Sequence, residues 1–439
     1  MGKYENYKDS GIEWIGEIPV NWGLKKLNWC FETIGSGTTP KAGEKEYYQN
    51  GIHNWLLTGD LNDDEVLDTS KKITDKAIED YSTLKEYPIN SVVIAMYGAT
   101  IGKLGILKIP TTVNQACCVF SEPIQCEHKF VFYNLLSARD EIINMSYGGG
   151  QPNISQAQLK QFRIQTPSLS EQTQITNYLD RKTTEIDQLI ADKKALVELY
   201  KEEKTAIINQ AVTKGINPDA KMKDSGIEWL GEIPQHWKVK KLKYVANIQT
   251  GRTPKISGST INYFENGVVN WYTPGDFIKG KYLTTSKRAL IKDAFINNQV
   301  ELFKKNSIYL VSIGATLGKV SMSINEASAN QQINVITFFN KEINPFYGYR
   351  FILGNAEMIL NEADYTTLPI LNQTKLNNIY IAVPSQNEQT KILEFIELES
   401  KRIDVKLERA KKYIDLLTEY RTVLISEVVT GKIKVTDDI

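Results

Sequence analysis

KDSGIEWIGEIPVNWGLKKL, residues 8–27, returns as KDSGIEWLGEIPQHWKVKKL at residues 223–242, so 15 of 20 positions match across an offset of 215. A chain of 439 residues has room for two copies of a domain, each with its own hydrophobic core. The repeat therefore predicts two similar globular bodies related by a pseudo-two-fold axis. It also predicts a ligand or partner that comes in two parts.

The duplication continues along the whole chain. GTTPK at residues 37–41 returns as GRTPK at 251–255, and GATIGK at 98–103 returns as GATLGK at 314–319. An Asn-Gln pair recurs at 114–115 and 330–331, and PSLSEQT from residue 167 corresponds to PSQNEQT from residue 384. Solenoid repeats are only about 20 to 45 residues long, so a repeat of this length is a duplication of a whole domain.

Composition sets the outer bounds of the prediction. With 41% hydrophobic and 24% charged residues the sequence is typical of a soluble chain of two or more domains. The first residues lack the apolar core of a signal peptide, and no run of 18 apolar residues occurs, so we expect a cytoplasmic protein. The four cysteines and three histidines show no metal-ligand spacing, which favours reduced structural thiols and no metal site.

Each half divides into a globular part and a helical part. The globular parts contain short apolar runs typical of buried strands, at 91–97, 113–120, 307–313 and 333–339, and helix-like segments at 130–137 and 345–354. The mixture predicts an α+β fold. A half-barrel and a sheet with flanking helices both fit this pattern.

The segments that follow Pro167 and Pro384 have the three-four spacing of long amphipathic helices. In the first segment the stripe consists of Ile175, Leu179, Lys182, Ile186, Leu189, Lys193, Leu196, Tyr200 and Ile207. In the second it consists of Ile392, Ile396, Glu399, Ile403, Lys406, Ala410, Tyr413, Leu417, Tyr420 and Leu424. Each helix of ~40 residues would be roughly 60 Å long. A single helix would leave its stripe exposed, so we expect an antiparallel coiled coil with one globular body at each end; two separate bundles are the alternative.

These motifs, in duplicate and in this order, resemble the specificity subunit of type I restriction-modification systems. The resemblance covers nearly all of the chain and rests on the GIEW(I/L)GEIPxxW segments, the GxTP and GATxGK loops and the PSxxEQ helix starts. It implies two α/β target recognition domains, separated by two long helices in an antiparallel coiled coil. It divides the chain into an N-terminal repeated region (1–23), a first target recognition domain (24–166), a central repeated region (167–222, helix about 171–210), a second repeated segment with the second target recognition domain (223–382), and a C-terminal repeated region (383–439, helix about 387–428).

The resemblance also implies a function. Each variable domain would read one half of a bipartite, asymmetric site on double-stranded DNA, while the helices set the spacing and dock two modification (methyltransferase) subunits. Those partners would methylate adenine with S-adenosylmethionine, and restriction subunits would join them to cleave DNA. This chain itself would bind no cofactor and would be non-catalytic.

Net charge supports DNA binding in only one half. The chain balances 52 Lys and Arg against 52 Asp and Glu, whereas DNA-binding proteins usually carry an excess of positive charge. Residues 239–383 carry 16 basic and 9 acidic side chains, a net charge of +7, but residues 24–166 carry 14 and 16, a net charge of −2. We expect the modification subunits, which embrace DNA in the complexes that this chain resembles, to assist the first domain.

Base reading needs forked donors and acceptors on loops, with cations nearby for phosphates. The repeated loops supply the candidates in both halves. In the first half they are Thr39, Lys41, Lys103, Asn114, Gln115, Gln151 and Asn153, and in the second they are Arg252, Thr253, Lys255, Lys319, Asn330 and Gln331. Arg252 replaces Thr38 in an otherwise repeated loop and has the geometry to pair bidentately with guanine. Positions that both halves share are poor candidates for reading different sequences, so the shared lysines suit phosphates, and a purely structural role stays open.

Four repeated tryptophans, Trp14, Trp22, Trp229 and Trp237, flank Ile-Pro pairs in glycine-containing loops. They are candidates for docking the partner subunits, and local packing is the alternative. Trp55 and Trp271 are expected in the cores.

Enzymatic functions find little support in the sequence. GATIGK has three residues between its glycines and Leu104 after its lysine, whereas a phosphate-binding loop needs four residues and then Ser or Thr. Residues 344–347, NPFY, lack the second proline of an amino-methyltransferase motif, and no glycine-rich strand-turn-helix for S-adenosylmethionine accompanies them. The alternative from another class is a bivalent scaffold whose two domains bind proteins or glycans without DNA specificity.

Overall fold

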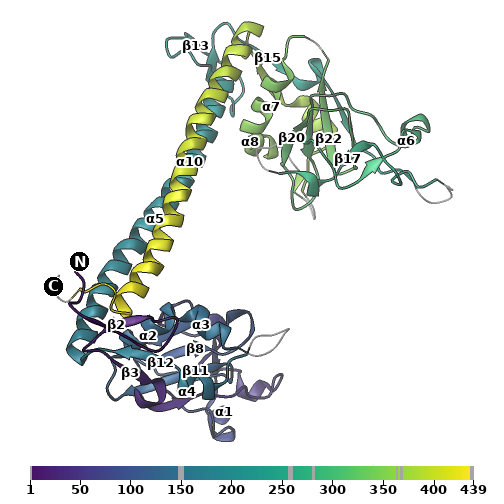
Figure 1. Cartoon of the computed structure of the whole chain (residues 1–439). Helices are drawn as coiled ribbons and strands as arrows, with labels where there is room; N and C mark the ends of the chain where they lie inside the picture. Colours follow the sequence, from purple (N-terminus) through teal and green to yellow (C-terminus); the bar gives the residue numbers. More distant parts are fainter. Residues whose placement is uncertain are drawn as a thin grey trace. The chain divides into compact units, whose positions relative to one another are not determined.

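The computed structural model describes residues 2–146, 153–255, 261–278, 282–339, 341–361, 364–365 and 369–435. The chain forms two compact units, one made of Met1–Lys194 with Lys412–Ile439 and the other of Ala195–Lys411. Each unit holds one globular domain and part of each of two long helices (Figure 1). The C-terminal segment thus packs with the first domain, although it is furthest from that domain in sequence.

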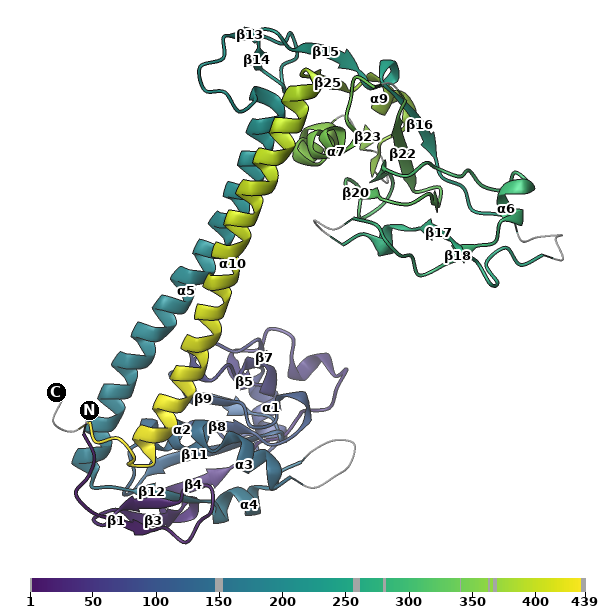
Figure 2. The ribbon, with the colours of Figure 1, turned by 45° about the horizontal axis from the view of Figure 1, so that its top comes forward.

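The first domain is built on a five-stranded sheet in the order β4-β11-β8-β9-β6. Its strands are β4 (Phe31–Gly35), β6 (Asp64–Val66), β8 (Val92–Ala95), β9 (Leu104–Leu107) and β11 (Cys117–Pro123). Both faces of β8 are buried: Val92 and Ile94 face one cluster, whereas Val93 and Ala95 face another. This explains the uninterrupted apolar run at 91–97, because a strand covered on both faces has no polar side. Helix α2 (His128–Ser137) packs on β8 and β9 (Figure 2).

A smaller sheet in the order β10-β5-β7 and several short elements complete the first unit. The sheet comprises β5 (His53–Leu56), β7 (Lys71–Ile73) and β10 (Thr112–Val113). The short elements are the pairs β1 (Tyr7–Asp9) with β2 (Glu17–Pro19) and β3 (Gly23–Lys26) with β12 (Arg163–Thr166), and the helices α1 (Asp75–Asp80), α3 (Arg139–Asn144) and α4 (Gln156–Gln161).

The second domain repeats this plan. Its main sheet, β16-β22-β19-β20, comprises β16 (Ala246–Thr250), β19 (Ser307–Val311), β20 (Val320–Ser323) and β22 (Ile333–Phe338). The smaller sheet, β18-β17-β21, comprises β17 (Val269–Tyr272), β18 (Ala289–Leu290) and β21 (Ser328–Ala329). The remaining elements are β13 (Met222–Asp224), β14 (Glu232–Pro234), β15 (Lys238–Lys241), β23 (Asp364–Tyr365), β24 (Pro369–Ile370), β25 (Tyr380–Val383), α6 (Asp293–Ile296), α7 (Pro345–Gly354), α8 (Ala356–Leu360) and α9 (Gln373–Asn378).

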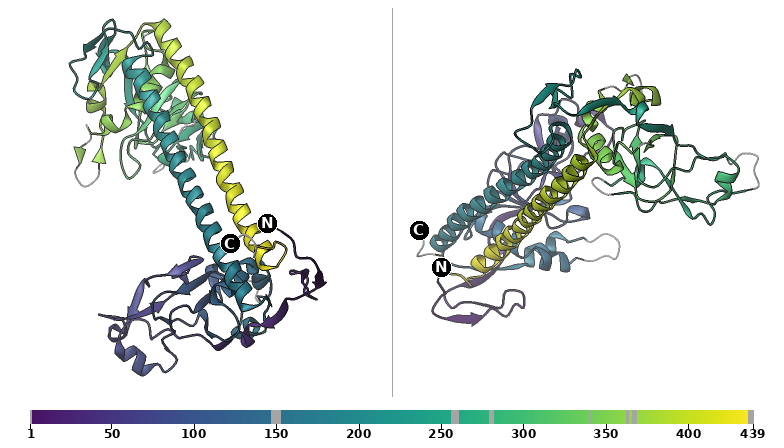
Figure 3. Two further views of the ribbon diagram at one scale, coloured as in Figure 1. Left: turned by 90° about the vertical axis from the view of Figure 1, so that its left-hand side faces the viewer. Right: turned by 90° about the horizontal axis from the view of Figure 1, so that it is seen from above.

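The long helices are α5 (Leu169–Lys214) and α10 (Gln386–Val429), and they run antiparallel within each unit (Figure 3). In the first unit Arg421 Nε lies 2.9 Å from Asp187 Oδ1, and Lys193 lies over the ring of Tyr413. In the second unit Lys204 Nζ lies 2.7 Å from Asp404 Oδ1. Residue numbers therefore fall along α10 as they rise along α5. The α+β class, the duplicated domain and the antiparallel helix pair are confirmed.

The helix stripes were predicted one residue out of place at several positions. Leu189, Tyr413 and Tyr420 are 45%, 53% and 49% exposed. On α5 the buried residues Ile186, Val197 and Ile208 are 11 residues apart, whereas on α10 the predicted positions Ile403, Ala410 and Leu424 are themselves buried. The difference has a physical cause, because the predicted stripe kept a strict 3.5-residue spacing, whereas an 11-residue spacing corresponds to about 3.67 residues per turn and drifts away from such a stripe along the helix.

Among the described helices, none combines the length and the apolar character that crossing a membrane would require.

Candidate nucleic-acid interface

Two loops of the first domain that were predicted from the repeat lie against each other. A Cβ atom added to Gly37 would lie 1.7 Å from the carbonyl oxygen of Val113, so only glycine lets the 37–41 loop approach the 113–115 loop this closely. Thr39 Oγ1 donates to Gln115 Oε1 at 2.5 Å, which joins the two loops. The indole of Trp55, buried as predicted, donates to the carbonyl oxygen of Thr38 at 3.2 Å.

The second domain builds the same arrangement from its own residues. A Cβ atom on Gly251 would lie 2.4 Å from the carbonyl oxygens of Ala329 and Asn330. Thr253 Oγ1 donates to Gln331 Oε1 at 2.5 Å, and the indole of Trp271 donates to the carbonyl oxygen of Arg252 at 3.0 Å. Each domain thus gathers its predicted loops at one end of the strands of its main sheet. We call this the loop edge: residues 37–41, 96–103, 113–116 and 153–154 in the first domain, and 251–255, 312–319, 329–332 and 370–371 in the second.

The repeated asparagines of the loop edge hold a turn. Asn114 Oδ1 accepts from the backbone N–H of Ala116 at 3.1 Å, and Asn330 Oδ1 accepts from that of Gln332 at 3.1 Å. Asn330 is only 7% exposed and also donates to the side chain of Gln332. Asn330 therefore has a structural role. Its amide holds the turn and has too little exposed surface to reach a base. Gln115 and Gln331, one residue later, are exposed.

The cations of the loop edge are mostly accessible. Lys255 and Lys319 are exposed and Lys103 is half-buried. Lys41 pairs with Glu44 at 2.9 Å, and both side chains remain open to solvent. Arg252 is 60% exposed and lies 3.6 Å from Glu301, which is longer than a good hydrogen bond. A guanidinium held this loosely is available to a phosphate or to a guanine edge.

The turn that carries Lys103 and Lys319 depends on its glycines. Gly98 and Gly102 have φ of 79° and 78°, in the left-handed region, and Gly314 and Gly318 have φ of 95° and 86°. The glycines repeat because the backbone needs them, which supports a positioning role for the loop rather than a reading role.

The remaining predicted residues of the first domain are Gln151 and Asn153. Gln151 lies outside the described residues. Asn153 is exposed and forms an isolated antiparallel bridge with Tyr97, the residue directly before the Gly-Ala-Thr turn. Sequence reasoning missed Tyr97 because it searched for positions that the two halves share, and the equivalent position in the second half is Ile313.

The repeated tryptophans are mainly packing residues. Trp22 and Trp237 are each 1% exposed and belong to the main cores of their domains, so neither indole has a surface with which to dock a partner. Trp14 is half-buried and stacks on Phe162 with ring centroids 5.7 Å apart. Trp229, also half-buried, meets the ring of Phe351 edge-on. Docking stays a prediction for Trp14 and Trp229 alone.

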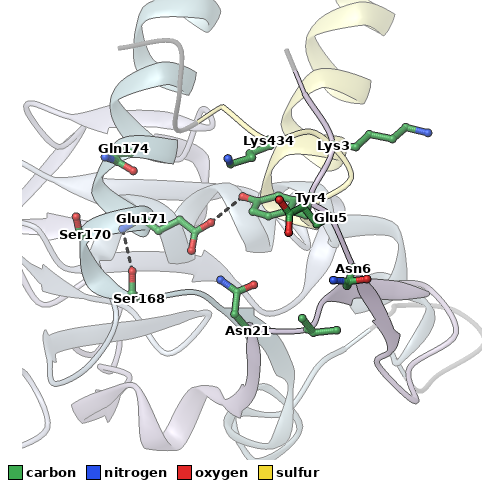
Figure 4. A pocket seen from close by; sticks show the side chains of 11 residues that line it. Lys3, Tyr4, Glu5, Asn6, Asn21, Ser168, Ser170, Glu171, Gln174 and Lys434 are labelled. Carbon is green, nitrogen blue, oxygen red and sulfur yellow. Dashed lines mark hydrogen bonds between the residues drawn. The ribbon is translucent and has the colours of Figure 1, made fainter.

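A shallow cavity of about 470 Å³ lies where the N-terminal segment meets the start of α5 (Figure 4). Tyr4 donates its hydroxyl to Glu171 at 2.8 Å, and the backbone N–H of Glu171 donates to Ser168 Oγ at 3.3 Å. Gly2 pairs with Lys434 through two backbone hydrogen bonds of 3.2 and 2.9 Å. The cavity is therefore the place where both ends of the described chain are tied to the first domain.

All four cysteines are free and buried. Burial raises the pKa of Cys118 to about 12, whereas the hydrogen bond with Cys30 lowers the pKa of Cys126. A thiol that stays protonated, as Cys118 does, is a poor nucleophile and a poor metal ligand. In the part of the chain that the structure describes, no group of three or more His, Cys, Asp or Glu side chains is arranged to hold a metal ion.

The type I restriction modification DNA specificity domain matches twice, at residues 19–199 and 234–412. Two type I restriction enzyme specificity subunits of Methanocaldococcus jannaschii are similar along their whole length: MjaIX is 25% identical, covering 96% of this chain and 95% of the relative, and MjaVIII is 24% identical, covering 99% and 97%.

Solved structures share the fold. A chain from a type I R-M system, solved in work on its complex assembly and conformational transition, has a TM-score of 0.67 at 12% identity and covers 95% of this chain and 99% of its own. The crystal structure of the HsdS subunit from Thermoanaerobacter tengcongensis has a TM-score of 0.55 at 13% identity, with 95% and 98% covered. Since the family domain matches most of the chain, and does so once in each half, this protein belongs to the type I restriction-modification DNA specificity family.

Proposed function

We propose that this chain is the DNA-recognition subunit of a type I restriction-modification complex and that each globular domain reads one half of a bipartite, asymmetric site. DNA recognition is the function of the family to which it belongs. The observation that carries the proposal is the duplication of the loop edge, with Thr39–Gln115 in one domain and Thr253–Gln331 in the other. Two equivalent edges with different exposed side chains suit a site with two different halves.

Within the loop edge, roles divide between shared and unshared residues. The shared lysines, Lys41 with Lys255 and Lys103 with Lys319, are proposed to contact phosphates, because a phosphate is the same in either half-site. Thr39, Thr253, Gln115, Gln331 and Asn153 face solvent wholly or in part and are proposed to lie close to the base edges. Arg252 is the proposed guanine reader of the second domain.

The two domains differ in how much DNA affinity their own charge provides. The net charge of +7 over residues 239–383 suits direct attraction to DNA, whereas the net charge of −2 over residues 24–166 does not. We propose that the modification subunits supply the missing positive surface beside the first domain. The affinity of the isolated chain for DNA should then be low, and it should rise steeply once the subunits are bound.

The helices α5 and α10 are proposed to set the distance between the half-sites and to carry the two modification subunits. Their outer faces hold exposed apolar side chains such as Leu199, Leu398 and Leu416, which are 58%, 66% and 51% exposed. The modification subunits are proposed to cover these leucines, because exposed apolar side chains mark an interaction site where they form a contiguous patch. The chain is proposed to be non-catalytic, with S-adenosylmethionine and adenine methylation belonging to the partners.

Methylome sequencing tests the proposal. A host that expresses this chain with its modification subunit is compared with the same host lacking the chain. Methylated adenines confined to one two-part motif, and absent without the chain, are expected. Arg252→Ala should relax or abolish the second half of the motif while the first half stays intact, which serves as an internal control. A soluble complex with an active methyltransferase and no mark that depends on this chain would contradict the proposal and favour a bivalent scaffold.

A further inference from the structure

The loop edges of the two domains share a backbone plan at one point where their side chains differ. Tyr97 forms an antiparallel bridge with Asn153, and Ile313 forms one with Ile370. The flanking backbone hydrogen bonds match as well: Met96 N to Ala116 O at 2.8 Å and Ile154 N to Met96 O at 2.8 Å in the first domain, against Ser312 N to Gln332 O at 2.7 Å and Leu371 N to Ser312 O at 3.0 Å in the second. The two bridges are therefore equivalent in structure.

Residues opposite each other in an antiparallel pair place their side chains on the same face, with Cβ atoms about 5 Å apart. The first domain thus presents a phenol beside a carboxamide, and the second presents two branched alkyl groups. Asn153 and Ile370 are exposed, the latter by 36%, whereas Tyr97 and Ile313 are half-buried. One member of each pair is anchored and the other reaches solvent.

The position of the pairs links them to the bases. Tyr97 and Ile313 directly precede the Gly-Ala-Thr turns that carry Lys103 and Lys319, and in the first domain the hydroxyl of Tyr97 also bonds to the side chain of Gln115. The surrounding threonine, glutamine and lysine are the same in both domains, so they cannot make one half-site differ from the other. The difference must come from side chains such as these, which differ at an equivalent place.

The chemistry of the pairs sets what each can read. Two isoleucines offer neither a donor nor an acceptor, and the C5 methyl group of thymine is the apolar group that base pairs display in the major groove. We infer that the Ile313–Ile370 pair reads a thymine methyl group in the second half-site, while Tyr97–Asn153 reads a hydrogen-bonding base edge at the equivalent place in the first. This inference rests on the proposed function and adds the kind of base that one pair recognises.

The test uses the complex of the full chain with its modification subunits and duplexes in which each thymine of the second half-site, on either strand, is replaced singly by uracil. Uracil keeps every hydrogen-bonding group and lacks only the methyl group. One replacement is expected to weaken binding about four-fold, the effect of exposing one methyl-sized group. The same replacement should have no further effect on the Ile370→Ala complex. Asn153→Ala is the matched control and should keep the full uracil effect.

Three results would overturn the inference while leaving the proposed function standing: a second half-site without thymine on either strand, binding that no uracil weakens, or a uracil effect of equal size in Ile370→Ala and wild type. A complex that methylates and binds DNA without sequence preference would instead overturn both. A second variant gives an independent readout, since Ile313→Tyr with Ile370→Asn, which grafts the first domain's pair, should change the second half of the methylated motif and leave the first half unchanged.

Discussion

At the scale of single residues, the close approach at Gly251 is the most sensitive point of the second loop edge. A methyl group there would lie 2.4 Å from two carbonyl oxygens, so Gly251→Ala must push the 251–255 loop away and separate Thr253 from Gln331. We expect the free energy of unfolding to fall by about 1–3 kcal/mol. Affinity for the second half-site should fall with it, as measured with duplexes altered in one half at a time. Gly275→Ala is the control, because its nearest neighbour would be 3.8 Å away and both properties should match wild type.

Glu388 is expected to make the stability of the fold depend on pH. Burial favours its neutral form, but hydrogen bonds from His236, Trp237 and Ser385 outweigh burial and hold the pKa of Glu388 below its usual range. A lowered pKa in the folded state means that the carboxylate stabilises the fold above the unfolded pKa of about 4.3 and that this stabilisation is lost as the pH falls through the folded pKa. Glu388→Gln should therefore be less stable than wild type by about 1 kcal/mol at pH 7.

Urea unfolding of both proteins between pH 7 and pH 3.5 checks this. The gap between wild type and Glu388→Gln should close toward the acid end of the series, whereas the exposed Glu394→Gln should follow wild type throughout. A gap that stays constant over the whole range would show that lost shape or packing, rather than the charge of Glu388, causes the destabilisation.

At the scale of elements, the first domain is fixed to α5 by a polar joint. Asp180 on α5 accepts from Lys129 at 2.5 Å and from Tyr133 at 2.8 Å, and both donors lie on α2. Removing the carboxylate leaves the partly buried Lys129 with only the more distant Glu65, 4.0 Å away, so Asp180→Ala should lower the free energy of unfolding by about 2 kcal/mol. Asp192→Ala removes an exposed carboxylate that accepts a hydrogen bond from Gln188 on the same helix, and should change the free energy of unfolding by less than about 0.5 kcal/mol. Equal effects in thermal or urea unfolding would argue against the joint.

The sequence pattern predicted the bounds of the long helices better than it predicted which of their residues face inward. Their existence follows from long runs without proline or glycine, and their observed bounds extend the predicted ones by four residues or fewer at each end. Their inward faces were harder to predict, because Lys204 and Arg421 lie where the two helices meet. A search for hydrophobic residues does not detect charged residues at such positions. Both make ion pairs with the opposite helix, Lys204 with Asp404 and Arg421 with Asp187. Polar seam residues weaken the apolar signal but can specify which residues of the two helices face each other.

At the scale of the whole molecule, the duplication made most of the candidate site predictable. Thr39 and Gln115 are separated by 76 residues and Thr253 and Gln331 by 78, yet the recurrence of their loops in both halves singled out all four as site candidates. Strand pairing could not be found in this way. The parallel pairing of β5 with β10, in which Trp55 lies opposite Thr112, depends on contacts between distant short segments that have no local signal. Residues that differ between the halves, Tyr97 and Ile313 above all, were hidden by the same search that revealed the shared ones.

The spacing between the half-sites is a property of the whole molecule, because both long helices must change together to alter it. If α5 and α10 set the gap between half-sites, one heptad inserted in register into both adds ~10.5 Å of helix, which corresponds to roughly 3 base pairs of DNA. Seven residues are close to two full helical turns, so the seam stays aligned and each domain keeps its own contacts. The expected result is a methylated motif with both half-sites unchanged and a gap about 3 base pairs longer.

Because the added base pairs also rotate one half-site about the DNA axis, we expect weaker binding as well. Insertion into α5 alone is the control and should abolish methylation, since it breaks the pairing of Asp187 with Arg421 or of Lys204 with Asp404. A motif whose gap stays the same in the double insertion would mean that the partner subunits, not these helices, determine the spacing.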